Sequence, residues 1–220
     1  MTFIHIKSDF VWPKVKRKNI DGARHYVDED NNVYHSVTKV TGSIPNEGLD
    51  AWKERVGEDV AKHVMIKAGL YGTRLHNYCE YYLNNEAIEF KDILSRAHFE
   101  QITPMLNDIR NIHGLEVKMF SKRMGLAGTV DCVADYDGIL SVIDFKTSTK
   151  AKPEEWIEGY FLQATCYALM WEENTGQKID QIVILMSGED ITQTVFIKDK
   201  KQYENRLFEV IAKFKLDVDT

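Results

Sequence analysis

The sequence lacks a long apolar run. No apolar stretch approaches the roughly 18 residues that a membrane-spanning helix needs, and no apolar signal segment opens the chain. The first residues, MTFIHIKSDF, are neither arginine-rich nor amphipathic, so we expect no mitochondrial transit peptide. These absences predict an intracellular protein with no membrane partner.

Cysteine is also scarce. Cys79, Cys132 and Cys166 are widely spaced and form no CxxC pair, which argues against a zinc ribbon or an iron–sulfur cluster. Three separate cysteines suit a reducing compartment better than a disulfide framework. We therefore expect three small, buried side chains.

Positive charge is not in excess, since the 220 residues carry a net charge of −6. This balance argues against a protein that coats nucleic acid through bulk charge, although it allows a local basic groove. It is also compatible with carboxylates gathered to hold cations. The 44% hydrophobic and 28% charged residues are typical of a soluble globular domain.

The periodicity of apolar residues predicts one α/β (α+β) domain over residues 1–220, with a central mixed sheet flanked by helices. Its expected parts are an amino-terminal hairpin and arm (1–48), a helical part (49–112), and a sheet with flanking helices (113–220).

In the helical part, residues 49–68 have helical spacing, Gly69 is a stop signal, and Thr73 is a plausible start of a second helix. Residues 90–114 continue as helix, with Pro104 kinking or splitting it. The remaining elements follow in chain order: a three-stranded meander over 115–121 and the two runs of 128–148, a helix over 153–175, strands over 181–188 and 191–198, and a helix over 200–216.

Two carboxylates interrupt runs that otherwise read as buried strands. Asp137-Gly138 predicts a hairpin turn, and a symmetric register around it places Asp131 opposite Asp144. Two carboxylates at such a short distance repel each other, so the pKa of one of them should be raised unless a cation lies between them. Lys146 follows Asp144 on the same face of the strand. The alternative, an exposed hairpin edge with a surface Asp–Lys pair, fits poorly with the apolar neighbours, and a divalent ion such as Mg²⁺ would relieve the repulsion.

The motif pair GTVD and DFKTS resembles that of PD-(D/E)XK nucleases, with Asp144 following 13 residues on from Asp131. GTRLH (72–76), QATCY (163–167) and the glycine-rich GLAGTVD resemble motifs of the RecB-like branch. HSVTKVTG, LDAWKERVGEDVAKH and GTRLHNYCEYYL are similar to the family of the mitochondrial genome maintenance exonuclease and its phage relatives. The resemblance covers about residues 34–171 and implies a restriction-endonuclease-like core.

The resemblance also implies roles for site residues. Ligands of one or two Mg²⁺ or Mn²⁺ ions would be His76, Asp131, Asp144 and the backbone carbonyl of Phe145. Glu116 is a candidate for a second ion or an outer-shell water, and Glu80 is either a partner of the imidazole or a surface acid. Catalytic residues would be Asp131, Asp144, Lys146, Gln163 and Tyr167, with Lys146 positioning or deprotonating the attacking water. Gln163 and Tyr167 would either contact phosphate or fix Lys146, and ordinary helix packing is the alternative for both. The cysteines do not match the iron–sulfur pattern of some RecB-like nucleases, so no such cluster is expected.

DNA is the expected partner, either single-stranded or with free ends. The expected contacts are Trp52, Arg55, Arg74, Thr147, Ser148, Lys150, Lys14 and Arg17. Two alternatives remain, because Trp52 also suits a core position and the basic run around Arg17 also suits a solvated edge that blocks strand pairing.

The predicted activity is that of a metal-dependent DNA exonuclease. The alternatives are a double-strand-specific exonuclease, a structure-specific endonuclease, a DNA-binding module without catalysis, and a structural subunit of a recombination complex. A recombination or replication protein would then be a further partner, and the cytoplasm of a bacterium or a phage-infected host the expected location.

Overall fold

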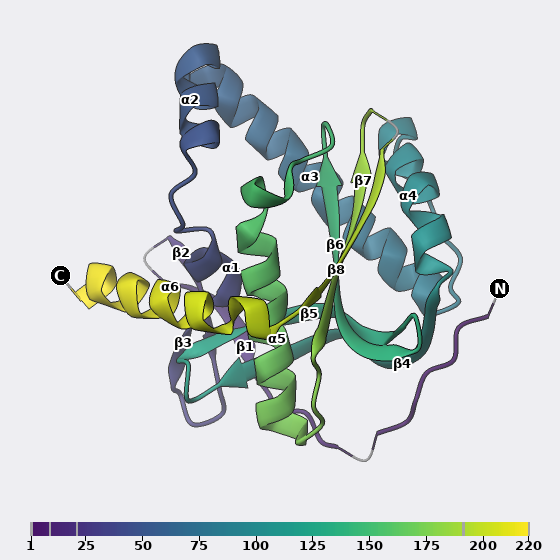
Figure 1. Cartoon of the computed structure of the whole chain (residues 1–220), viewed down its shortest axis with the longest axis vertical. Coiled ribbons are helices and arrows are strands. Elements are labelled where there is room, and N and C mark those ends of the chain that lie inside the picture. Colours follow the sequence, from purple (N-terminus) through teal and green to yellow (C-terminus); the bar gives the residue numbers. More distant parts are fainter. Residues whose placement is uncertain (1, 9, 21, 191, 220) are drawn as a thin grey trace.

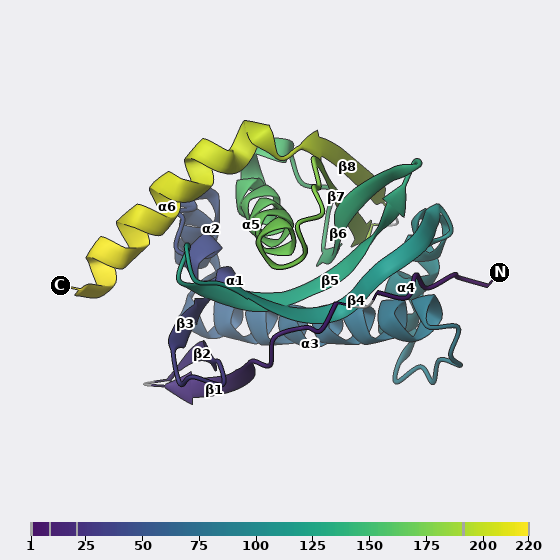
Figure 2. The same cartoon turned by 90° about the horizontal axis from the view of Figure 1, so that it is seen from below.

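One mixed sheet carries the fold of the residues that the computed structural model describes, which are 2–8, 10–20, 22–190 and 192–219. Helices α3 and α4 cover one face of the sheet, and α5 and α6 cover the other (Figures 1 and 2). The helices are α1 (Val37–Thr41), α2 (Glu47–Val56), α3 (Glu58–Leu83), α4 (Ile93–Leu106), α5 (Glu158–Thr175) and α6 (Lys201–Asp219), with a short 3₁₀ turn η1 (Glu154–Trp156) before α5. This arrangement confirms the predicted α/β class.

The strands pair in the order β1-β2-β3-β5-β6-β7-β8, and β4 pairs with the other side of β5. They are β1 (Lys16–Ile20), β2 (Ala23–Val27), β3 (Val33–Ser36), β4 (Ile109–Ser121), β5 (Leu126–Tyr136), β6 (Ile139–Ser148), β7 (Gln181–Gly188) and β8 (Gln193–Asp199). The predicted meander β4–β5–β6 is therefore confirmed. The strand predicted over 191–198 begins at a position that lies outside the described residues.

The sheet forks along β5. On the side away from β4, the start of β5 pairs with β3 at Leu126 and Ala127, and its end pairs with β6 from Cys132 onward. Within the described ladders, the stretch from Gly128 to Asp131 has no strand partner on that side. This fork gives side chains room inside the sheet itself.

The β5–β6 hairpin has the predicted register, from Tyr136 opposite Ile139 to Cys132 opposite Ile143. The ladder ends one pair before Asp131 and Asp144. These two residues therefore continue the register but are not paired as strand partners. The Phe145 N–H instead donates to Asp131 Oδ2 at 2.9 Å. A carboxylate thus replaces the backbone partner at the mouth of the fork.

Near the amino terminus, β2 and β3 form the predicted hairpin, and the basic β1 pairs with β2 as an edge strand. The second strand-like run is shorter than predicted. It is a strand only over Val33–Ser36 and continues as α1.

The predicted boundary between the first two helices is wrong. The chain breaks at Gly57, whose φ of 84° and ψ of 156° suit glycine alone, and α3 then continues through Gly69 and Thr73. Thr73 is not a cap, because its Oγ1 donates back to the Gly69 carbonyl at 2.9 Å inside the helix. As a result, α2 and the first half of α3 project beyond the sheet (Figure 1).

The predicted end of the helical part is also wrong. Pro104 lies in the last turn of α4, and β4 begins at Ile109, within the stretch predicted as helix. Pro104 does not split α4, since the helix ends only two residues later. Among the described helices, none combines the length and the apolar character required to cross a bilayer.

Candidate active site

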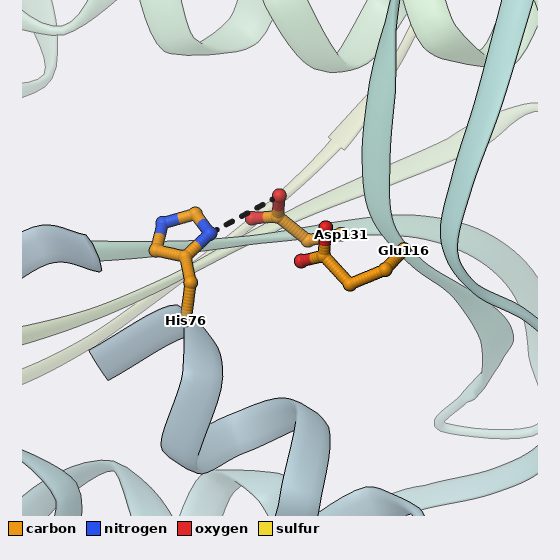
Figure 3. A group of neighbouring side chains, drawn as sticks. All are labelled: His76, Glu116 and Asp131. Carbon is orange, nitrogen blue, oxygen red and sulfur yellow. Dashed lines mark ion pairs between the residues drawn. The ribbon is translucent and has the colours of Figure 1, made fainter. Parts of the chain in front are cut away.

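His76, Glu116 and Asp131 meet at the fork of the sheet (Figure 3). They come from α3, β4 and β5, and one potential ligand atom from each lies within 4.8 Å of the others. The His76 Nδ1 atom is 3.3 Å from Asp131 Oδ1. The three side chains therefore offer one imidazole nitrogen and two carboxylates to a shared point.

Glu116 takes a backbone conformation that is unusual for a strand. Its φ is 51°, in the left-handed region that non-glycine residues rarely adopt. On either side of it, Leu115 packs toward α3 whereas Val117 packs toward α5, so β4 changes faces at Glu116. The β4–β5 ladder also skips the step between Glu116 and Asp131. This local irregularity brings the two acids together at the fork.

Asp144 and Lys146 form the second half of the site. Asp144 is only 1% exposed, its Oδ2 is paired with Lys146 Nζ, and its Oδ1 accepts a hydrogen bond of 2.8 Å from Gln163 Nε2. The predicted placement of Lys146 on the face of Asp144 is therefore confirmed. Gln163 holds the carboxylate of Asp144, whereas the prediction had it fixing Lys146 or contacting phosphate.

The pKa values of Asp131 and His76 move apart. Burial alone would raise the pKa of Asp131 and lower that of His76, but their mutual attraction reverses both shifts. The pKa of Asp131 is lowered, and the pKa of His76 is raised. The pair therefore favours carboxylate and imidazolium when no metal ion is present.

The other two acids shift the opposite way. Burial raises the pKa of Glu116 to about 7, and the negative charge of Asp131 adds to the effect. Burial likewise raises the pKa of Asp144 to about 6, with Lys146 opposing and Asp131 reinforcing the rise. Three carboxylates thus crowd a space where the nearby positive side chains do not fully offset their repulsion.

This donor set fits a hard divalent cation. Carboxylate oxygens are the ligands that Mg²⁺ prefers, and Mn²⁺ also accepts imidazole nitrogen. The Phe145 N–H points into the fork, and the N–H and C=O of one strand residue project to the same side, so its carbonyl also faces the fork. Glu80 lies one turn beyond His76 on α3, and its charge acts on Glu116.

Glycines of two predicted motifs lie at close approaches within this assembly. A Cβ atom on Gly128 would lie 2.7 Å from the hydroxyl of Tyr167, which is buried against β5. A Cβ atom on Gly72 would lie 3.9 Å from Thr147 Oγ1, so α3 passes close to the end of β6. Tyr167 therefore packs behind the fork, and burial raises its pKa well above the usual value.

The predicted DNA contacts are dispersed over the surface. Trp52 and Arg55 lie on the projecting α2, half-buried and exposed respectively, away from the acid cluster. Arg74 pairs with Asp92 at the start of α4. Two of the other predicted contacts have partners within the protein, since Ser148 Oγ donates to the Lys150 carbonyl and Lys14 pairs with Glu29. Arg17 is exposed on β1, and Thr147 is half-buried beside Gly72.

Sequence reasoning missed two residues beside Lys146. The Lys146 ammonium lies 5.1 Å from the ring centre of Tyr160 on α5, and Lys152 Nζ donates to the Tyr160 hydroxyl at 3.2 Å. Tyr160 precedes Gln163 by three residues, so helical spacing alone would have placed both on one face of α5. This three-residue spacing is the sequence feature that could have identified Tyr160.

The cysteines lie on opposite sides of the sheet. Cys79 and Cys132 pack on the α3 face, and Cys166 packs on the α5 face. All three are buried, as predicted.

Most of the chain is similar to known proteins. Residues 26–215 match the family model of the PD-(D/E)XK nuclease superfamily. The chain is 33% identical over 145 residues to mitochondrial genome maintenance exonuclease 1 of Homo sapiens, covering 61% of this chain and 40% of that protein. It is 39% identical over 133 residues to the protein of the same name from Xenopus tropicalis, covering 56% of this chain and 38% of that protein. The chain thus spans about two fifths of the length of these relatives.

Proposed function

The chain belongs to the PD-(D/E)XK nuclease superfamily, and from that membership we propose that it is a divalent-metal-dependent DNA exonuclease acting on single strands or free ends. The observation that carries the proposal is the convergence of His76, Glu116 and Asp131 beside the Asp144–Lys146 pair. The relatives are themselves named as exonucleases of mitochondrial genome maintenance, which supports both the activity and a role in DNA maintenance.

Five groups of the site are candidate ligands of the metal ion. His76, Asp131, Asp144, Glu116 and the Phe145 carbonyl would hold Mg²⁺ or Mn²⁺. When bound, the ion supplies positive charge to the scissile phosphate and lowers the pKa of an attacking water.

Lys146 completes the reacting centre. Its ammonium forms an ion pair with Asp144 and has further N–H donors for the attacking water or a phosphate oxygen. Burial would lower the pKa of Lys146, but the charge of Asp144 raises it above the usual value. Lys146 is therefore placed to act as a positioning and electrostatic group on the attacking water or a phosphate oxygen.

Gln163 and Tyr160, both on α5, contact the side chains of the reacting centre. Gln163 fixes the orientation of Asp144, and Tyr160 limits where the Lys146 ammonium can move. Neither residue needs to touch the scissile bond.

DNA would reach the site past the projecting helices and the end of β6. Thr147 and Lys150, which follow Lys146 within four residues, are candidate contacts for phosphates next to the scissile one. The exposed Arg55 on α2 and the basic β1 edge with Lys14 and Arg17 are candidate contacts for more distant phosphates.

The activity is tested with matched DNA substrates and Mg²⁺ or Mn²⁺. The protein should degrade a linear single strand and leave a covalently closed single-stranded circle intact. Cleavage of the circle would replace the exonuclease by an endonuclease. Faster degradation of blunt duplex than of single strand would overturn the strand preference.

Two substitutions test the assigned centre. Lys146→Ala and Asp144→Ala should each lower kcat by about 10²-fold or more while leaving DNA binding largely intact, because each removes a group that acts on the reacting atoms. Lys213→Ala, an exposed lysine on α6, is the matched control and should keep the wild-type rate. Wild-type cleavage by Lys146→Ala would place the active site elsewhere.

A further inference from the structure

The loop between β6 and α5 presents the most exposed tryptophan of the chain. Trp156 is 62% exposed, whereas Trp171 is 3% exposed and Trp12 and Trp52 are half-buried. Single apolar residues on a surface are common, but a large indole left open to water is costly unless it has a partner. Trp156 lies in η1, directly before α5 and its active-site residues.

The exposure of Trp156 does not come from a loose loop. Glu154 pairs with Lys198 of β8 at 2.7 Å, and Ile157 is buried at 1% exposure in the core beneath α5. Earlier in the loop, the Ala151 N–H donates to Asp190 Oδ2 at 3.2 Å. The indole is therefore held outward between fixed neighbours, as in preorganised binding surfaces.

The same loop carries a lysine tied to the reacting centre. Lys152 Nζ donates to the Tyr160 hydroxyl, and the ring of Tyr160 also faces the Lys146 ammonium. Both ammonium groups lie within 5.5 Å of the centre of that ring. Because Lys198 offsets Glu154, the charged groups that remain next to Trp156 in this segment are Lys152, which can meet a phosphate, and Glu155.

We propose that this loop is a nucleotide subsite, in which Trp156 stacks on an unpaired base and Lys152, oriented by Tyr160, contacts a phosphate of the same strand. The proposal rests on the proposed exonuclease function, because it places the subsite beside the scissile phosphate. Aromatic stacking accepts any base and requires that the base be unpaired. The subsite would thus favour single-stranded over duplex DNA.

Binding measurements separate the two contacts. With EDTA present to prevent cleavage, Trp156→Ala should raise the Kd for a single-stranded oligonucleotide about tenfold and leave the Kd for blunt duplex within about twofold. Trp156→Phe should retain most of the affinity. Lys152→Ala should weaken binding to any single strand and reduce the salt dependence by about one phosphate contact.

An oligonucleotide made of abasic sites supplies the matched probe. It keeps the phosphates and removes the bases, so wild type and Trp156→Ala should bind it equally, whereas Lys152→Ala should still bind it less well. Phe208→Ala, an exposed aromatic of α6, is the control and should bind all three probes as wild type does. Addition of the natural single strand should quench the tryptophan fluorescence of wild type, and this change should be absent in Trp156→Phe.

The results distinguish the failure of the subsite from the failure of the function. If the wild type degrades single strands but Trp156→Ala binds them with an unchanged Kd, the subsite is wrong and the exonuclease stands. An equal loss of affinity for the abasic probe would also overturn stacking. If the wild type neither binds nor degrades single strands, the proposed strand preference and the subsite both fail.

Discussion

Gln163 is the side chain that orients Asp144. Its Nε2 donates to Asp144 Oδ1, and both residues are buried between α5 and the sheet. A hydrogen bond that fixes a metal-binding carboxylate contributes through the affinity for the metal, since such partners typically change it 10- to 100-fold. If the proposed function holds, Gln163 is thus a positioning residue, because it acts through Asp144.

Replacing this amide should change the metal titration. Gln163→Met keeps the volume but removes the donor, so we expect the Mn²⁺ or Mg²⁺ concentration for half-maximal cleavage to rise about tenfold, with much of kcat recovered at saturating metal. Gln202→Met on the exposed side of α6 is the control. If Gln163→Met lowers the Tm yet leaves the metal titration as in wild type, Gln163 is only a packing residue.

The contact between Gly128 and Tyr167 makes a second prediction. A Cβ atom at position 128 would lie 2.7 Å from the hydroxyl and 2.8 Å from Cε1 of a ring that is fully enclosed. Gly128→Ala should therefore lower the free energy of unfolding by about 1–3 kcal/mol, the usual cost of overpacking. Urea unfolding measures this cost. The double variant with Tyr167→Phe should recover only part of it, because the ring carbon stays; an unchanged urea midpoint in Gly128→Ala would contradict the packing.

Residues that lie on one hairpin can be predicted from the sequence, and residues that depend on several elements cannot. Asp137-Gly138 sets the register of β5 and β6, so the amino-acid pattern alone places Asp131 near Asp144 and Lys146 beside Asp144. Glu116 remains an open candidate on that basis, because a left-handed residue within a strand leaves no mark in the apolar pattern.

At the scale of elements, the helical arm formed by α2 and the first half of α3 shows why the helix boundary was misplaced. Apolar residues at helical spacing continue across Gly57 and Gly69 alike, and glycine itself marks either a break or a tolerated interior position. The structure distinguishes them by conformation, since Gly57 has a φ of 84° and Gly69 is an exposed residue inside α3.

Two alanine substitutions test this boundary. Gly57→Ala should lower the free energy of unfolding or open α2 locally, at a cost of about 1–3 kcal/mol, because the Gly57 conformation is essentially closed to other residues. Gly69→Ala should raise stability by about 0.5–1 kcal/mol, because alanine favours helix and its Cβ meets no other atom within 4 Å.

Urea unfolding reports the global effects of both variants, and limited proteolysis near residue 57 reports local opening of α2. The opposite order, with Gly69→Ala destabilising and Gly57→Ala neutral, would restore the boundary that the periodicity predicts.

At the scale of the whole molecule, the site joins parts that are distant in sequence. His76 belongs to the helical part, Glu116 and Asp131 to β4 and β5, and Asp144 to β6. The raised pKa values of Glu116 and Asp144 show that their charges are poorly compensated in the metal-free fold. A bound cation would therefore stabilise the native arrangement of all these elements at once, and would have no such site in the unfolded chain.

Metal binding should accordingly raise thermal stability. At a metal concentration 100 times its Kd, linkage contributes about 2.7 kcal/mol, which for a chain of this size raises the Tm by about 5–10 °C. Differential scanning fluorimetry with and without Mn²⁺ measures the shift without reference to cleavage. Asp131→Asn should abolish most of it, because it removes the charge that pairs with His76 at the centre of the ligand set, whereas Asp50→Asn on α2 should keep it. If Asp131→Asn and wild type gain equally from Mn²⁺, the ion binds elsewhere, and the fork of the sheet is not the metal centre.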